Sequence, residues 1–237
     1  MRAGIVASGL HIEPPLDPAT LEGLELWLEG SDLDHLSDGS PVSLWNDRSG
    51  HGRHAIQNES SAMPKKVSIN GVSAVAFNGV AGTFLRSTAS AGYAEMTMMT
   101  AIRLNSGTTS TYQTVLGGHA ATSLALEVVQ YNPYVRTWGK SGAVRQWVSL
   151  APDEWFALGC SYDIVTLSSI YSSAVGSASL SHPLNIGSEI IVGAKRHDGI
   201  DPLNGQIAEA MVFSTALGSS TVTDIIEYFS SKYNVGA

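Results

Sequence analysis

The sequence has little cysteine, few charged residues and no long apolar run. Its one cysteine, Cys160, has no partner for an intramolecular disulfide, so packing must hold the fold together. Cys160 lies in the apolar run 155–162, where we expect it to be buried. Charged residues make up 14% of the chain, and the formal net charge is −8. Such a surface repels phosphate backbones and anionic lipids, and no segment approaches the ~18 apolar residues of a membrane helix. We therefore expect neither nucleic acid nor a membrane as a partner.

The chain also lacks the short motifs that carry catalysis in several large enzyme classes. It contains no G-x-S-x-G elbow, no phosphate-binding Walker loop, no G-x-G-x-x-G turn and no H-E-x-x-H pair. Hydrolase, kinase and dehydrogenase functions each depend on one of these arrangements. The sequence therefore predicts a protein that is not an enzyme and that needs no cofactor, apart from the calcium ion considered below.

Short segments with strand character fill most of the chain. In 24–29 leucines alternate with Glu and Trp, a period of two that is typical of a strand. Turn residues separate most of the segments, and there is no internal repeat. This pattern predicts an all-β fold, an antiparallel β-sandwich in one domain over 21–237. Further strands are expected at 42–45, 67–69, 72–77, 83–86, 96–104, 112–117, 122–130, 134–138, 143–150, 155–164, 167–173, 188–193 and 206–213.

The two ends of the chain differ from this pattern. Residues 220–232 have apolar side chains at helical spacing, which predicts one C-terminal helix. Ser219, Ser220 or Thr221 is expected to cap its start. Residues 1–20 contain three prolines and read as an arm. Because the first ten residues are apolar and nearly uncharged, we expect the arm to dock on a neighbouring subunit rather than to form a disordered tail. They do not have the form of a signal peptide.

Two groups of motifs resemble a known family. The first comprises Leu-Trp-Leu at 26–28, Trp45-Asn-Asp47-Arg-Ser-Gly-His-Gly52, and Ile-Asn-Gly-Val-Ser-Ala-Val-Ala-Phe-Asn-Gly at 69–79. The second comprises Gly-Gln-Ile-Ala-Glu at 205–209 and Lys-Tyr at 232–233. Together they resemble the opening and closing segments of laminin G-like domains in the concanavalin A-like lectin/glucanase superfamily. This resemblance implies a jelly-roll sandwich that spans most of the chain.

The first motif also has a local physical interpretation. Trp45 is expected to fill a core pocket, and Asp47 to accept backbone N–H groups within its turn. Gly50 and Gly52 are expected to supply positive φ angles. Glycosidases of the superfamily carry E-x-D-x-x-E on one strand, and this sequence has no such pattern.

The resemblance implies a structural or binding role. Similar domains occur in bacteriophage virion proteins, so we expect a tail, neck or capsid-decoration component that exposes a lectin-like domain toward host surface glycans. The arm would contact other virion subunits, and the chain would form a homo-oligomer or part of a larger assembly. The alternative is a free carbohydrate-binding module or adhesin, extracellular or on a cell surface and dependent on calcium.

One hairpin carries the residue types that bind sugars. Tyr134, Arg136 and Trp138 share a face of an extended strand, and Asn132 precedes them. Trp138 could stack on a pyranose ring while Arg136 and Asn132 bond to hydroxyls. The other interpretation is that Trp138 and Trp147 pack in the core or pair across strands.

One loop offers hard oxygen ligands for calcium. Asp198, Asp201 and Asn204 lie within seven residues of each other, next to Gly199 and Pro202. The other interpretation is a solvated turn in which these side chains cap backbone groups.

Overall fold

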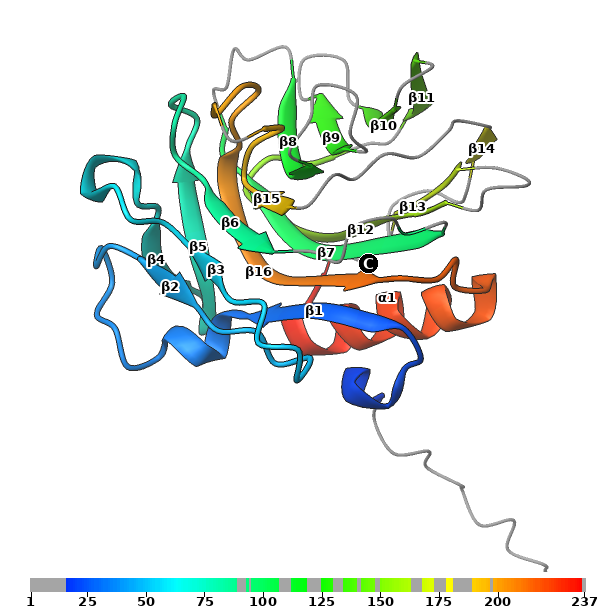
Figure 1. The fold of residues 1–237 in the computed structure, drawn as a ribbon, viewed down its shortest axis with the longest axis horizontal. Helices are drawn as coiled ribbons and strands as arrows, with labels where there is room; N and C mark the ends of the chain where they lie inside the picture. The colour runs from blue at the N-terminus through cyan, green and yellow to red at the C-terminus, as the bar shows by residue number, and fades with distance from the viewer. Residues whose placement is uncertain are drawn as a thin grey trace, which may run out of the picture.

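The computed structural model describes residues 16–88, 93, 95–106, 112–118, 125–129, 134–139, 142–147, 150–162, 168–172, 178–180, 189–196 and 198–235. Strands are the main regular element of this part of the chain (Figure 1). In chain order they are β1 (Leu24–Glu29), β2 (Leu44–Trp45), β3 (Ala55–Ile56), β4 (Lys65–Ile69), β5 (Val72–Asn78), β6 (Leu85–Thr88), β7 (Met96–Leu104), β8 (Gln113–Gly118), β9 (Ala125–Val129), β10 (Tyr134–Gly139), β11 (Gly142–Trp147), β12 (Trp155–Tyr162), β13 (Ser168–Ser172), β14 (Ala178–Leu180), β15 (Glu189–Val192) and β16 (Asn204–Phe213).

The described strands form two antiparallel sheets. Sheet A has the order β14-β13-β12-β7-β16-β5-β4, with β1 also paired to β16. Sheet B has the order β11-β10-β9-β8-β15-β6-β3-β2. The predicted all-β sandwich with one C-terminal helix is confirmed. The short strands β3 and β14 were not predicted, because their sequences show too few alternating positions to be recognised.

The main core lies between the sheets. Cross-strand partners share a face, and Leu158, Thr100 and Ala210 form one such row in sheet A. Sheet B contributes Trp45 and Leu126, both fully buried. Cys160 is 1% exposed, as predicted, and burial raises the pKa of its thiol to about 12. The thiol is therefore protonated at neutral pH and acts as a small apolar side chain.

The helix α1 (Ser219–Tyr233) lies along the face of sheet A that points away from sheet B (Figure 1). Its buried residues, Val222, Ile225, Phe229 and Tyr233, belong to the predicted apolar stripe. The predicted caps are wrong: Gly218 is the N-cap and makes no side-chain bond, and the helix begins at Ser219, so all three predicted caps lie within its first turn. None of the helices among the described residues has the length and apolar character that crossing a bilayer requires.

Three single 3-10 turns complete the described elements: η1 (Pro18–Thr20), η2 (Gly30–Leu33) and η3 (Ser60–Ala62). Pro18 begins η1 and is buried, and the Asp17 carboxylate accepts the N–H of Ala19 at 3.0 Å. The last residues of the predicted arm thus form a regular turn, since proline suits the first position of a helix. Residues 1–15 lie outside the described residues.

Candidate functional site

The strongest polar cluster of the described structure lies between sheet A and α1. Glu29 of β1 stands directly opposite Glu209 of β16. Two carboxylates at this spacing repel each other, and the ammonium group of Lys232 lies between them, 2.9 Å from Glu29 and 2.8 Å from Glu209. Arg48 forms a second ion pair with Glu29. The cluster therefore joins β1, β16 and the last turn of the helix.

Glu209 is fully buried and accepts from several other donors. The indole Nε1 of Trp27 donates to it at 2.6 Å, and the hydroxyls of Tyr228 and Tyr233 also donate to it. Burial raises the pKa of Glu209 even though these donors and the charge of Lys232 act to lower it. Burial and the charge of Glu209 likewise raise the pKa of both tyrosines. The resemblance motifs at 26–28, 205–209 and 232–233 thus meet in one network that fastens the helix to the sheet.

Asp47 holds the turn between β2 and β3. Its carboxylate accepts backbone N–H groups from Trp27 at 3.0 Å, Ser49 at 2.9 Å and Arg53 at 2.9 Å. Gly50 and Gly52 have φ angles of 90° and 67°. The prediction that Asp47 forms the turn is confirmed, and its bond to Trp27 also ties the turn to β1.

The bonds to Asp47 make stability depend on pH. Burial acts to raise the pKa of Asp47, but the backbone donors and the Ser49 hydroxyl outweigh it, so the pKa lies below its ordinary value of 3.8. A lowered folded-state pKa adds stability that is present above the unfolded pKa and is lost as pH falls through the folded pKa. Asp47→Asn is expected to cost about 1 kcal/mol at neutral pH, and the difference from wild type should shrink below about pH 4. Urea unfolding at a series of pH values measures this, and a difference that stays constant down to pH 2 would contradict it.

Three of the predicted sugar-binding residues, Tyr134, Arg136 and Trp138, lie on β10, next to the edge strand β11 of sheet B. Arg136 of β10 is opposite Glu127 of β9 and Arg145 of β11. Leu126 and Val128, the neighbours of Glu127, are in the core, so the Glu127 row lies on the opposite face. Asn132 lies outside the described residues.

The register adds residues to this face that the sequence interpretation missed. Tyr134 is opposite Trp147, and Trp138 is opposite Ala143. The two tryptophans are therefore not cross-strand partners of each other. Alternation within the hairpin 131–147 was the signal that could have placed Arg145 and Trp147 beside Arg136 and Tyr134. We call this set, Tyr134, Arg136, Trp138, Arg145 and Trp147, the hairpin face.

The predicted calcium loop borders the same face of sheet B. Lys195 lies 3.1 Å from Glu127 and 3.6 Å from Asp201, and the backbone N–H of Thr114 in β8 donates to the Asp201 carbonyl at 2.8 Å. Lys195 of the loop thus contacts Glu127, the residue opposite Arg136 in the register of β9 and β10.

The three predicted calcium ligands have separate partners. Asp198 pairs with Arg196 at 2.8 Å, Asp201 pairs with Lys195, and the side-chain amide oxygen of Asn204 accepts from the side-chain amide of Asn105 at 2.8 Å. Among the described residues no three His, Cys, Asp or Glu side chains gather as a metal-binding set. Calcium binding here stays a prediction, and it would require both aspartates to leave their cationic partners.

Comparison with known proteins identifies the fold but no family. No protein-family model matches the chain, and no curated protein matches its sequence. The binding domain of Paraclostridial Mosquitocidal Protein 1 superposes with a TM-score of 0.61 at 14% identity, over 90% of this chain and 53% of that one. The botulinum neurotoxin serotype D ligand-binding domain in complex with N-acetylneuraminic acid gives 0.60 at 12% identity, over 89% and 51%. Trypanosoma rangeli sialidase in complex with sialic acid gives 0.59 at 14% identity, over 91% and 34%.

These likenesses define the class of fold. The chain is an antiparallel β-sandwich with a C-terminal helix packed on one sheet. It spans about half of each toxin domain and about a third of the sialidase. At identities this low the likeness concerns the fold alone, so function must be argued from the residues.

Proposed function

We propose that this protein is a non-catalytic carbohydrate-binding module of the concanavalin A-like type, and that it binds glycans at the hairpin face. The observation that carries this proposal is the register of β10 and β11, which places three aromatic residues and two arginines on one face at the edge of sheet B. Aromatic rings stack on the apolar faces of sugar rings, and arginines donate to their oxygens. Two structural neighbours in complex with sialic acids support a glycan as the ligand.

The proposal that the protein is non-catalytic is supported by the surroundings of its acidic side chains. Glycosidases need two carboxyl groups that flank the scissile bond. The closest carboxylate pair in sheet A, Glu29 and Glu209, is bridged by Lys232, and Glu209 is fully buried under α1. A sugar therefore has no access to the pair.

A single substitution tests the hairpin face. Trp138→Ala is expected to weaken binding of a hit from a glycan array about tenfold or more, because a stacking surface is lost. Leu44→Ala is the matched control: Leu44 is 44% exposed on β2, at the opposite edge of the same sheet. Equal binding by both variants would contradict the hairpin face as the site, and an array that stays blank with wild type would contradict glycan binding.

The finer proposal places the domain on a virion as a tail, neck or capsid-decoration component, with the arm 1–20 in contact with other subunits. The resemblance to domains of bacteriophage virion proteins supports it. The alternative is a free module or adhesin outside the cell, for which Asp198, Asp201 and Asn204 remain the proposed calcium ligands. Mass spectrometry of purified particles, with and without residues 1–15, separates the two: a virion component is recovered with the particle and is lost when the arm is removed.

A further inference from the structure

A cavity of about 530 Å³ lies on sheet A just beyond the end of α1. The helix covers the part of the sheet that carries Glu209 and ends at Tyr233, followed by Asn234 in the left-handed conformation. Farther along the same face, Trp155 of β12, Arg103 of β7 and Gln206 of β16 form a cross-strand row. The Tyr233 ring at the end of the helix packs against Trp155 of this row, with ring centroids 6.3 Å apart, and both side chains line the cavity.

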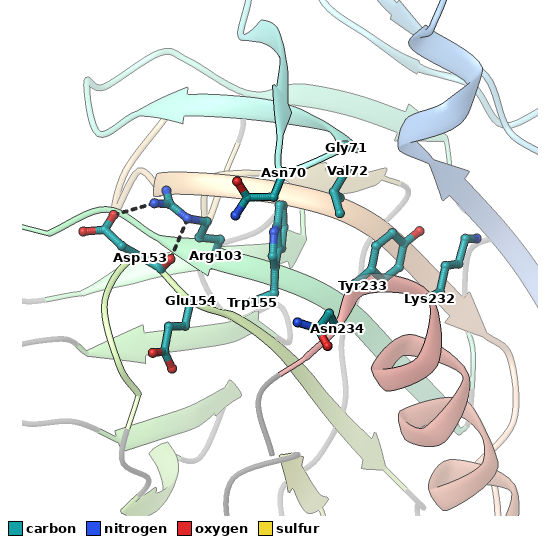
Figure 2. A pocket seen from close by; sticks show the side chains of 10 residues that line it. All are labelled: Asn70, Gly71, Val72, Arg103, Asp153, Glu154, Trp155, Lys232, Tyr233 and Asn234. Carbon is teal, nitrogen blue, oxygen red and sulfur yellow. Dashed lines mark hydrogen bonds and ion pairs between the residues drawn. The ribbon is translucent and has the colours of Figure 1, made fainter.

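Four segments line the cavity (Figure 2). They are the turn between β4 and β5, Arg103 of β7, the start of β12 with the two residues before it, and the end of α1. Figure 2 shows the Trp155 ring upright among the lining side chains, with its nitrogen on the side of Arg103 and Asn70. The polar residues of the lining include Asn70, Arg103, Asp153, Glu154, Trp155 and Asn234.

The two cationic side chains of the lining are already neutralised. Arg103 lies 2.9 Å from the Asp153 carboxylate and donates to Gln206 at 2.9 Å. Lys232 lies between Glu29 and Glu209. Glu154, by contrast, is exposed at the rim and takes part in no ion pair of the described structure. An anionic ligand would therefore meet a negative charge with no unpaired cation to receive it.

The indole Nε1 of Trp155 is a buried donor with no acceptor among the described residues. Trp155 as a whole is only 8% exposed. An unpaired buried N–H costs about 1–3 kcal/mol, so native structures rarely contain one without a partner. The side-chain amides of Asn70 and Asn234 lie exposed at the same cavity and make no hydrogen bond within the described residues. Each amide can both donate and accept.

We propose that this cavity binds a neutral polyhydroxylated ligand, a saccharide unit, as a second site distinct from the hairpin face. A hydroxyl accepts from Trp155 Nε1, and further hydroxyls exchange hydrogen bonds with Asn70 and Asn234. An ammonium group has no acceptor to offer Trp155, and a carboxylate is disfavoured by Glu154. The inference rests on the proposed carbohydrate binding and deepens it by assigning a second site and its ligand class.

Two-dimensional ¹H–¹⁵N NMR spectra of the ¹⁵N-labelled full chain test the proposal. The Trp155 indole resonance is assigned with Trp155→Phe, which keeps an aromatic side chain and removes the N–H. The probes are the methyl glycosides of glucose, galactose and N-acetylglucosamine at tens of millimolar, with N-acetylneuraminic acid as the charged comparison. At least one neutral glycoside is expected to shift the Trp155 indole and the Asn70 and Asn234 amides, and N-acetylneuraminic acid is expected to leave them unchanged.

Two substitutions test the amides at the cavity without straining the backbone. Asn234→Gly and Asn70→Asp each keep a residue that tolerates the left-handed conformation, where φ is 49° and 52°. Together they are expected to weaken glycoside binding, followed at the Trp155 indole, about tenfold or more, while Leu44→Ala leaves this affinity unchanged.

The possible results separate this inference from the proposed function. Saccharides that shift only resonances of β10 and β11 overturn the second site and leave glycan binding intact. Equal shifts of Trp155 with N-acetylneuraminic acid overturn the neutral ligand class. If neither the glycosides nor the array yields binding anywhere, both proposals fall.

Discussion

Glu209→Ala is expected to lower the free energy of unfolding by about 3–5 kcal/mol, one of the two largest effects in this protein. Glu209 is fully buried and accepts from Trp27, Tyr228, Tyr233 and Lys232. Its removal leaves the Lys232 ammonium with Glu29 alone and leaves the Trp27 N–H without an acceptor. Denaturation by guanidinium, with the midpoint and the slope fitted together, measures the loss.

Three further variants separate the charge from the packing. Glu209→Gln keeps an acceptor for Trp27 and should lose less than alanine. Glu209→Leu combined with Lys232→Met removes both charges, and such apolar replacements are often close to neutral, so it should recover part of the stability. Glu227→Ala, an exposed site on the same helix, should change stability by less than about 0.5 kcal/mol. A loss below about 1 kcal/mol for Glu209→Ala would show that the network does not fasten the helix.

Trp45→Ala is expected to lower the free energy of unfolding by about 3–5 kcal/mol, the second of the two large effects. Replacing a large core side chain with a small one leaves a cavity, and for Trp the loss of stability is of this size. Trp45 is 0% exposed, and its indole N–H donates to the backbone oxygen of Glu29 at 2.8 Å. The substitution removes the packed ring and the link between β2 and β1 at once. Thermal and urea unfolding both report the change.

Further substitutions separate the loss of packing at Trp45 from the loss of its hydrogen bond. Trp45→Phe keeps most of the ring and loses the hydrogen bond, so it should cost less than alanine. Leu44→Ala, on the opposite face of the same strand, should cost less than about 0.5 kcal/mol, because Leu44 is 44% exposed. Equal effects of the Trp45 and Leu44 alanine variants would be incompatible with Trp45 as a core residue.

The residue types of the hairpin face could be predicted from the sequence, but the full set of residues that share this face could be predicted only in part. Alternation placed Tyr134, Arg136 and Trp138 on one face, which needs only local geometry. The addition of Arg145 and Trp147 depends on the register of the hairpin, and a shift of one residue would move them to the other face. The ion pair of Glu127 with Lys195 had no signal in the sequence, since Glu127 lies on β9 and Lys195 in the loop after β15, two strands that β8 brings together.

The sequence by itself determined the class of fold, the positions of most strands, the C-terminal helix and the Asp47 turn. These follow from periodicity, from turn residues and from bonds between near neighbours, so short segments are enough to specify them. Only the tertiary structure decided that Trp27 and Glu209, 182 residues apart, form a hydrogen bond, and that the end of α1 meets Trp155 beside a cavity. The reason is physical: strand pairing and helix docking set distances between segments, and local propensity carries no information on them.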